Sequence, residues 1–343
     1  MALGSQQPLP VASGGNAALS PTVSAPGKVL LLGEYAVLEG AVALVTTVNR
    51  RVCVRASAAA DEPQLPPEVR EAHVLATGAF SVRNLPWPDI DVTALYSGDQ
   101  KLGLGSSAAA AVAAAGRVAQ AAGADLADPG VKEQVFDLAF AAHRAVAPRG
   151  SGTDVAASAF GGTLRVRRQV GGSDAPPGAD VSLDVEPLAW PPDLGVGVVW
   201  TGTPVRTSSM VETLSRYASA ESGAYASQME TLRAYAWQGA QAFYSGQSAG
   251  VLEAARGYGE GLRALGRAAR LPIYTERLDA LTQAAAELGL VAKPSGAGGG
   301  DVAVVFYQDS EAFKRLCTRL GDMGCHFLDV EVHVEGVRSE QVP

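Results

Sequence analysis

The sequence is constrained most by the stretch Gly103-Leu104-Gly105-Ser106-Ser107, which runs directly into an alanine-rich segment. Because alanine favours helices and serine favours helix starts, this junction predicts a glycine loop, a cap at Ser106 and a helix to about Ala122. Glycines let the backbone approach a ligand closely, and the N–H groups at a helix N-terminus attract anions. The stretch is therefore a candidate phosphate-binding loop, although the motif G-x-x-x-x-G-K-[ST] is absent. A loop that only turns the chain into the helix is the alternative.

Three further segments combine glycine with charged residues. They read APGKVLLLGEY from Ala25 to Tyr35, RGSGTDVAA from Arg149 to Ala157, and KPSGAGGGD from Lys293 to Asp301. The chain has only five lysines, and three of them (Lys28, Lys101 and Lys293) belong to the glycine-rich motifs. Because the chain carries a formal net charge of −8, an anionic ligand needs such local cations. Solvated surface lysines are the alternative interpretation.

The composition is that of a globular protein. Of the 343 residues, 47% are hydrophobic and 18% are charged, so the chain can bury a sizeable core, and its length favours two domains. The negative net charge disfavours nucleic-acid binding. No apolar run approaches the roughly 20 residues that a membrane helix needs, so we expect no membrane association. The three cysteines match no zinc or redox spacing, and we expect reduced thiols in a cytoplasmic protein.

Strand-like and helix-like segments alternate along the chain, which indicates two α/β-type layers. Residues 1–22 carry no charged side chain and are expected to form a disordered tail. The remainder is expected to form an N-terminal domain over residues 23–190 and a C-terminal domain over residues 191–343. The expected strands cover residues 29–32, 44–48, 51–55, 195–201, 301–307 and 327–334. The expected helices cover residues 106–122, 131–146, two or three stretches within 208–270, 274–288 and 310–322.

The three motifs at residues 25–35, 101–109 and 293–301 together resemble, in order and spacing, those of the GHMP kinase superfamily, which includes galactokinases, homoserine kinases, mevalonate kinases and phosphomevalonate kinases. The resemblance covers about residues 23–335. Mevalonate kinases typically have G-E-H where this chain has Gly33-Glu34-Tyr35, and P-S-G-x-D where it has Gly150 to Asp154. The features that resemble the phosphomevalonate kinase branch are Arg149-Gly150-Ser151-Gly152-Thr153-Asp154, Trp200-Thr201 followed by Ser208-Ser209-Met210-Val211, and Ile273-Tyr274.

This resemblance implies an α/β (α+β) fold of two domains, a ribosomal-protein-like α/β domain and a ferredoxin-like α+β domain, with the active site in the cleft. It also implies ATP and Mg²⁺ as cofactors, a monomer or homodimer, and phosphorylation of 5-phosphomevalonate to 5-diphosphomevalonate for isoprenoid precursors. A mevalonate kinase or another small-molecule kinase of the superfamily is the alternative of the same class. A catalytically silent ligand sensor on the same fold is the alternative of a different class, and the intact Lys28, Ser107 and Asp154 argue against it.

Residue roles follow from the resemblance, motif by motif. Lys28 and Asp154 are the expected catalytic residues, and Ser107 is the expected Mg²⁺ ligand. Asp154 is expected to orient the acceptor rather than to act as a strong base, because a phosphate acceptor is already largely ionised at neutral pH. The expected ATP-binding residues are Gly103, Leu104, Gly105, Ser106, Ser107 and Ala108. The expected substrate-binding residues are Lys101, Arg149, Ser151, Arg206, Ser208, Ser209, Ser295, Gly296, Ala297 and Gly298.

One position departs from the mevalonate kinase pattern. Those enzymes carry a magnesium-binding glutamate on the helix before the aspartate motif, whereas the nearest position here is His143, and no carboxylate lies between Asp137 and Asp154. Magnesium would then rest on the serine hydroxyl, ATP oxygens, water and Asp154, because it keeps several waters and takes few protein ligands. For His143, a helix residue bonded locally is the alternative to a functional role.

Overall fold

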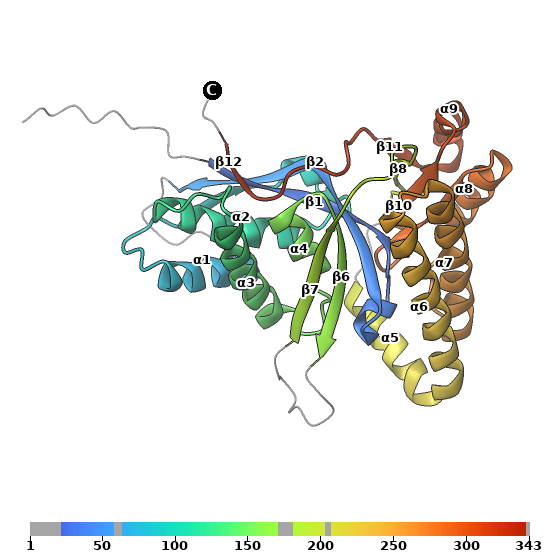
Figure 1. Ribbon diagram of the computed structural model, residues 1–343, viewed down its shortest axis with the longest axis horizontal. Coiled ribbons are helices and arrows are strands. Elements are labelled where there is room, and N and C mark those ends of the chain that lie inside the picture. The colour runs from blue at the N-terminus through green and yellow to red at the C-terminus, as the bar shows by residue number, and fades with distance from the viewer. Residues whose placement is uncertain (1–21, 58–63, 171–180, 203–206, 341–343) are drawn as a thin grey trace, which may run out of the picture.

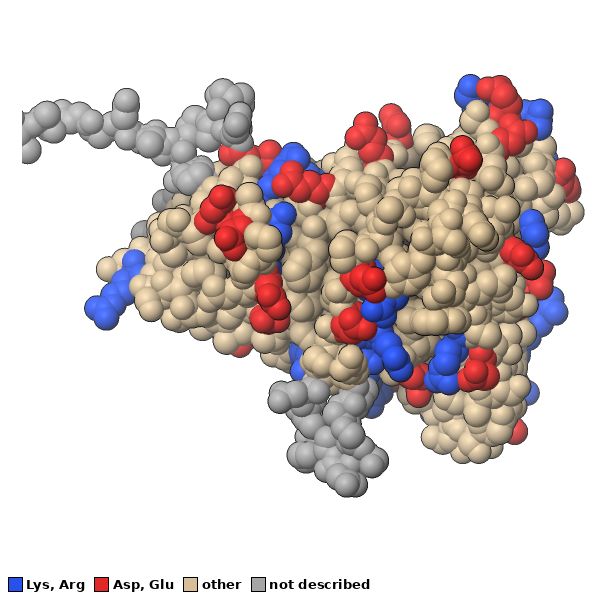
Figure 2. All heavy atoms as spheres, in the orientation of Figure 1, with Lys and Arg blue, Asp and Glu red and all other residues tan. Residues whose placement is uncertain are grey.

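The computed structural model describes residues 22–57, 64–170, 181–202 and 207–340. Figure 1 shows two sheets side by side, each with helices packed against it. Acidic and basic side chains are interspersed over the face shown in Figure 2. Among the described helices, none combines the length and the apolar character needed to cross a bilayer.

The first sheet is antiparallel and has the strand order β12-β1-β2-β6-β7, with β3 paired to β2. Its strands are β1 (Thr22–Leu32), β2 (Val42–Ala56), β3 (Pro88–Asp91), β6 (Thr163–Val170), β7 (Val181–Leu188) and β12 (Arg338–Glu340). Helices α1 (Pro67–Ala79), α2 (Ser106–Ala121), α3 (Pro129–Val146) and α4 (Thr153–Phe160) lie on one side of this sheet (Figure 1). All alanines of α2 except Ala121 are buried, and their small side chains let the helix lie close to β1 and β2.

The second sheet has the order β11-β8-β10-β9. Its strands are β8 (Gly195–Trp200), β9 (Val291–Ser295), β10 (Val302–Tyr307) and β11 (His326–Leu328), and its helices are α5 (Thr207–Ala220), α6 (Ser222–Tyr244), α7 (Ser248–Ala269), α8 (Glu276–Glu287) and α9 (Ser310–Arg319). Alternate residues of β10 point to opposite faces. Val302, Val304 and Phe306 join the core shared with α6 and α7. Ala303 and Val305 join a second core with α8 and α9.

Short elements complete the fold. They are the 3₁₀ turns η1 (Ala36–Glu39), η2 (Thr93–Leu95) and η3 (Gly321–Met323) and the hairpin β4 (Tyr96–Ser97) and β5 (Gln100–Lys101). The hairpin directly precedes the glycine loop. It therefore delivers the chain from the edge of the first sheet into the start of α2.

The two sheets share one hydrophobic core rather than being separated by a linker, since the larger core contains residues of both. The chain also returns to the first sheet after β11. Val332 forms an isolated bridge with Val48, Glu335 forms one with Gly161, and β12 pairs with β1. The segment 332–340 therefore belongs to the first sheet, although the sequence predicts a C-terminal domain that continues to residue 343. The return covers an otherwise exposed edge of β1, as edge strands commonly require.

Candidate active site

The four glycine-rich motifs, far apart in the sequence, meet at the loop of residues 103–105. The Lys28 N–H donates a hydrogen bond of 2.8 Å to the Leu104 carbonyl. A Cβ placed on Gly105 would lie 3.1 Å from the Lys28 Cε and 3.7 Å from the Asp154 Cβ, and one placed on Gly103 would lie 2.8 Å from the Asp301 Cβ. Residues from the other three motifs thus surround this loop.

The loop itself depends on two glycines in the left-handed region. Gly103 has a φ of 76° and Gly105 a φ of 81°, conformations that other residues rarely adopt. Gly105 is the N-cap of α2, and Ser106 is the first helical residue, so the predicted side-chain cap at Ser106 is wrong. The reason is that the turn into α2 needs a positive φ, which serine does not readily supply. The first N–H groups of α2 have no partner within the helix and can therefore bind an anion.

Asp154 lies in the first turn of a second helix, α4, beside the same loop. The N-cap of α4 is Gly152, which is also left-handed with a φ of 77°. The Asp154 Oδ1 accepts a hydrogen bond of 3.0 Å from the Val155 N–H, and the side chains of Asp154 and Lys28 are both half-buried. The α4 N-terminus, with the carboxylate it carries, and the Lys28 side chain thus border the same glycine loop. Their charges suit a site for phosphate groups and a metal cation.

The last motif packs against the first motif, and few of its residues face the cleft between the two sheets. Ser295 is buried, and its Oγ accepts a 2.8 Å hydrogen bond from the Leu30 N–H. The Ala297 carbonyl accepts a 2.5 Å hydrogen bond from the Tyr35 hydroxyl. A Cβ on Gly298 would lie 2.5 Å from the Ile273 carbonyl oxygen, so this glycine is required by packing. Gly296 has open space beside it. Of the residues 295–298, it is therefore the one best placed to face a ligand.

Lys293 does not face the cleft, contrary to the expectation that the motif lysines serve the anionic ligands. Its side chain is 0% exposed, and its Nζ lies 2.5 Å from the Glu34 Oε1. Burial raises the pKa of Glu34 and lowers the pKa of Lys293, and the contact between the two groups opposes both shifts. The charge of Lys293 is therefore matched within the protein, and Lys28 and Lys101 remain as motif lysines for ligands.

The residues expected to hold the acceptor lie on several segments. Lys101 is exposed on β5, and Arg149 is exposed in the turn after α3. Ser151 is half-buried, with its Oγ 2.9 Å from the Thr153 Oγ1. Arg206 lies outside the described residues, and Ser208 and Ser209 lie in the first turn of α5, where the side chains are not described. His143 lies on α3 and packs against the turn at Gly150, in keeping with a local role.

The described residues contain no group of three or more His, Cys, Asp or Glu side chains that could hold a metal ion alone. The oxygen donors beside Gly105 nevertheless suit Mg²⁺. Ser107 lies in the first turn of α2 and would supply a hydroxyl, and Asp154 lies in the first turn of α4 and would supply a carboxylate. Because Mg²⁺ prefers oxygen ligands and takes few from the protein, phosphate oxygens and water would complete such a site.

A hollow of about 310 Å³ between the two sheets adjoins the loop. Tyr96 and Leu102 line it from the first sheet's side, and Trp200 and His326 line it from the second. Within the described part of the chain, the buried Trp200 Nε1 has no hydrogen-bond partner. Sequence reasoning missed this hollow, because its lining residues belong to no single motif.

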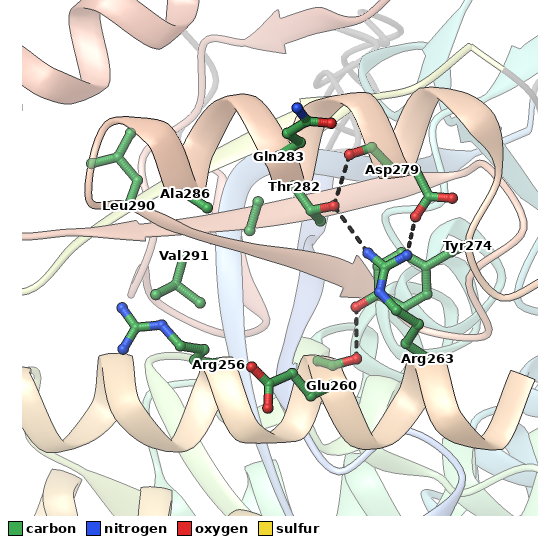
Figure 3. Close-up of a pocket in the computed structure, with 12 residues that line it drawn as sticks. Arg256, Glu260, Arg263, Tyr274, Asp279, Thr282, Gln283, Ala286, Leu290 and Val291 are labelled. Atoms are coloured by element: carbon green, nitrogen blue, oxygen red, sulfur yellow. Dashed lines mark hydrogen bonds and ion pairs between the residues drawn. The ribbon is translucent and has the colours of Figure 1, made fainter.

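Two larger hollows lie elsewhere. One of about 620 Å³ lies between α3 and β7. The other, of about 460 Å³, is a slot between α7 and α8 with β9 at its floor (Figure 3). In that slot Arg263 stacks on Tyr274 with its Cζ 4.0 Å from the ring centroid, and it pairs with Asp279. The arginine is thus already neutralised, and the slot lacks the glycine loop that would bind phosphates.

Comparison with known proteins identifies the family. The family model described as the GHMP kinases N terminal domain matches residues 77–162, and that described as GHMP kinases C terminal matches residues 251–324. A phosphomevalonate kinase from Streptomyces sp. (strain CL190) is 30% identical over 344 residues, covering 85% of this chain and 91% of that protein. A mevalonate kinase from Aeropyrum pernix is 29% identical over 182 residues, covering 45% of this chain and 53% of that protein.

Solved structures agree on the fold. The Streptococcus pneumoniae phosphomevalonate kinase in complex with phosphomevalonate and AMPPNP has a TM-score of 0.75 and 21% identity, and the match covers 91% of this chain and 99% of that one. The chain belongs to the GHMP kinase family and has its two-domain fold. Within the family it is a phosphotransferase that is similar to phosphomevalonate kinases.

Proposed function

We propose that the protein transfers the γ-phosphoryl group of ATP to the phosphate of 5-phosphomevalonate, giving 5-diphosphomevalonate and ADP. The observation that carries this proposal is the convergence of Lys28, Asp154 and the α2 N-terminus on Gly105. The choice of acceptor is supported by similarity along 85% of the chain to the Streptomyces phosphomevalonate kinase.

ATP would lie with its phosphates on the loop and its base in the adjoining hollow. The N–H groups of residues 103–108 would surround the phosphates, and Ser107 with Asp154 would hold Mg²⁺, which neutralises phosphate charge when bound. Leu102 lines the hollow and is followed directly by Gly103, so one ligand can reach both places.

The chemistry needs positioning more than proton removal. A phosphate oxygen of the acceptor attacks the γ-phosphorus, and the bond from that phosphorus to the bridging oxygen of ADP breaks. Because the acceptor phosphate is already largely ionised at neutral pH, no strong base is required. Lys28 would stabilise negative charge on the transferring group, and Asp154 would keep the lysine and the metal in place beside the acceptor oxygen.

A phosphorylated acceptor requires cations beyond those that bind ATP. Lys101, Arg149 and Arg206 are the proposed contacts to its phosphate, with hydroxyls from Ser151, Ser208 and Ser209. Gly296 would complete the wall on the opposite side, since open space lies beside it. Arginine offers a planar pair of donors suited to two phosphate oxygens, whereas lysine supplies a point charge.

Both substrates are water-soluble metabolites, and the three cysteines are unpaired, in keeping with a cytoplasmic enzyme.

A coupled assay of ADP release with phosphomevalonate and mevalonate in parallel tests the proposal. We expect phosphomevalonate to be preferred by at least about tenfold in kcat/KM, the effect of a single charged hydrogen bond. Equal or better turnover of mevalonate would refute the assignment and favour a mevalonate kinase.

A further inference from the structure

The first and last motifs are joined by a buried ion pair. Glu34 follows β1 and Lys293 lies in β9, and both side chains are 0% exposed. The Lys293 Nζ lies 2.5 Å from the Glu34 Oε1 and also donates a 2.7 Å hydrogen bond to the Pro294 carbonyl. Neither side chain is exposed to the cleft, so neither can contact a bound substrate directly.

Further polar contacts surround the pair. Tyr258 of α7 is fully buried, and its hydroxyl donates a 2.7 Å hydrogen bond to the Glu34 carbonyl while its ring centroid lies 5.8 Å from the Lys293 Nζ. The Leu30 N–H reaches Ser295, and the Tyr35 hydroxyl reaches the Ala297 carbonyl. Residues 30–35 of the first motif are therefore joined to residues 293–297 of the last by three separate contacts.

Such a pair is poorly explained as a source of stability. Removing two charges from water is costly, and well-packed apolar residues of similar volume often stabilise a core as well or better. An ion pair, unlike an apolar pair, fixes the relative orientation of the two segments that carry it. Its attraction and hydrogen bonds are favourable in only one alignment of these segments. The alignment fixed here is that of the segment containing Gly296 relative to the strand that carries Lys28.

We propose that Glu34 and Lys293 are positioning residues that hold residues 295–297 in register with Lys28 for phosphoryl transfer. The inference rests on the proposed function for its assay. Lys28 lies six residues before Glu34 on the same segment, so a shift between β1 and β9 changes the distance from Lys28 to Gly296. The loop of residues 103–107 does not depend on the ion pair for its position relative to Lys28, because the Lys28 N–H donates a hydrogen bond directly to the Leu104 carbonyl. Loss of the pair should therefore lower kcat with little effect on the KM for ATP.

The decisive variant replaces both charges with apolar side chains, Glu34→Met with Lys293→Met. Each single substitution leaves one buried charge unpaired and should lower Tm by roughly 10 °C. The double variant should return to within about 5 °C of the wild type, since no charge is left unpaired. Its kcat should nevertheless stay about tenfold or more below the wild-type value, a loss that impaired stability cannot explain. A double variant with wild-type Tm and with kcat within threefold of wild type would overturn the proposal.

A milder variant tests the same alignment should the double variant fail to fold. Tyr35→Phe removes only the hydroxyl that binds the Ala297 carbonyl. Tyr274→Phe is the matched control, because the Tyr274 hydroxyl donates a 2.9 Å bond to the Gly259 carbonyl in the slot behind the motif (Figure 3). We expect kcat to fall by about threefold to tenfold in Tyr35→Phe and to be unchanged in Tyr274→Phe. Equal losses in both variants, or no loss in either, would count against the proposal.

Amide hydrogen exchange separates this proposal from the proposed function. The Gly299 N–H is bonded to the Ile273 carbonyl, so the peptide covering residues 295–300 starts from a protected state. In the double variant, or in Tyr35→Phe, this peptide should exchange at least several-fold faster than in the wild type. Unchanged exchange would contradict the positioning role even if turnover fell. A wild-type protein inactive on phosphomevalonate would count against the proposed function, and the exchange result would still decide the role of the pair.

Discussion

The glycine-rich segments 103–107 and 295–299 look alike in the sequence but have different neighbours in the structure. At Gly103 and Gly105 the space that a side chain would occupy borders Asp301, Lys28 and Asp154, which are charged residues of the cleft. At Gly298 the same space is filled by the Ile273 backbone, and Ser295 and Ala297 are bonded to the first motif. The neighbours of the first segment fit the ligand-binding role that we propose for it, whereas the second segment mainly forms the contact between the sheets, with Gly296 as its open position.

The difference shows that glycine content alone does not identify a ligand-binding loop. A missing side chain can make room for phosphate or for a neighbouring strand, and only the neighbours decide which. The neighbours likewise decide the role of each motif lysine. Lys28 borders the loop, whereas Lys293 is buried against Glu34.

The largest effect on turnover is expected for the two charged residues that border the loop, Lys28 and Asp154. Asp154→Asn or Lys28→Met should lower kcat by at least about a hundredfold, because each removes a charge that acts in the transition state. Binding of ATP should persist, since the loop donors remain. Steady-state kinetics with nucleotide titration of the folded variants checks this, and near-full turnover in Asp154→Asn would remove its catalytic role.

A bulky residue inside the loop should have the next largest effect. Gly105→Val forces a branched side chain to a φ of 81° and against Lys28, so we expect kcat/KM for ATP to fall by about tenfold to a hundredfold. Gly78→Ala is the control, because Gly78 lies in α1 with open space and no positive φ. Unchanged ATP dependence in Gly105→Val would show that the loop only turns the chain.

Substitutions on the acceptor side should separate the two substrates. Arg149→Gln or Lys101→Met should raise the KM for phosphomevalonate by about tenfold to a hundredfold, with much less effect on the KM for ATP, since each removes one charged hydrogen bond. Paired KM measurements check this. Retained preference for phosphomevalonate after loss of Lys101, Arg149 and Arg206 together would mean that the acceptor phosphate lies elsewhere.

The smallest effects should distinguish two glycines within the last motif. Gly296→Ala and Gly298→Ala both force alanine into the left-handed region, which costs about 1 kcal/mol. Only Gly298→Ala also meets the Ile273 backbone at 2.5 Å, so it should lower Tm by several degrees more. Gly296→Ala should instead reduce turnover a few-fold with little change in Tm. Thermal melts with matched assays test the contrast, and the reverse pattern would contradict the roles given to these two residues.

The sequence predicts the parts of the site that depend on local backbone geometry. The loop and the helix after it could be predicted because glycine, serine and alanine specify that turn and helix. The proximity of Lys28 and Asp154 was expected only from the resemblance to the family. The fold could be predicted through the family's motif order. Helix α1 and strand β9 were missed, since each is short or weakly patterned and is stabilised mainly by packing.

Long-range partners could not be predicted. The burial of Lys293 depends on Glu34, 259 residues away, and the return of β12 to β1 depends on an edge that only the folded sheet creates. The hollow beside Leu102 likewise combines residues from both sheets. In each case the deciding neighbour comes from a distant segment, which local pattern does not encode.

The most direct test of the central claim is ³¹P NMR of the product formed by the wild-type protein from ATP, Mg²⁺ and phosphomevalonate. We predict ADP together with a new pair of coupled phosphorus signals from a diphosphate, as the phosphomevalonate signal disappears. Release of inorganic phosphate with phosphomevalonate unchanged, or a product formed only when mevalonate is supplied, would contradict the account.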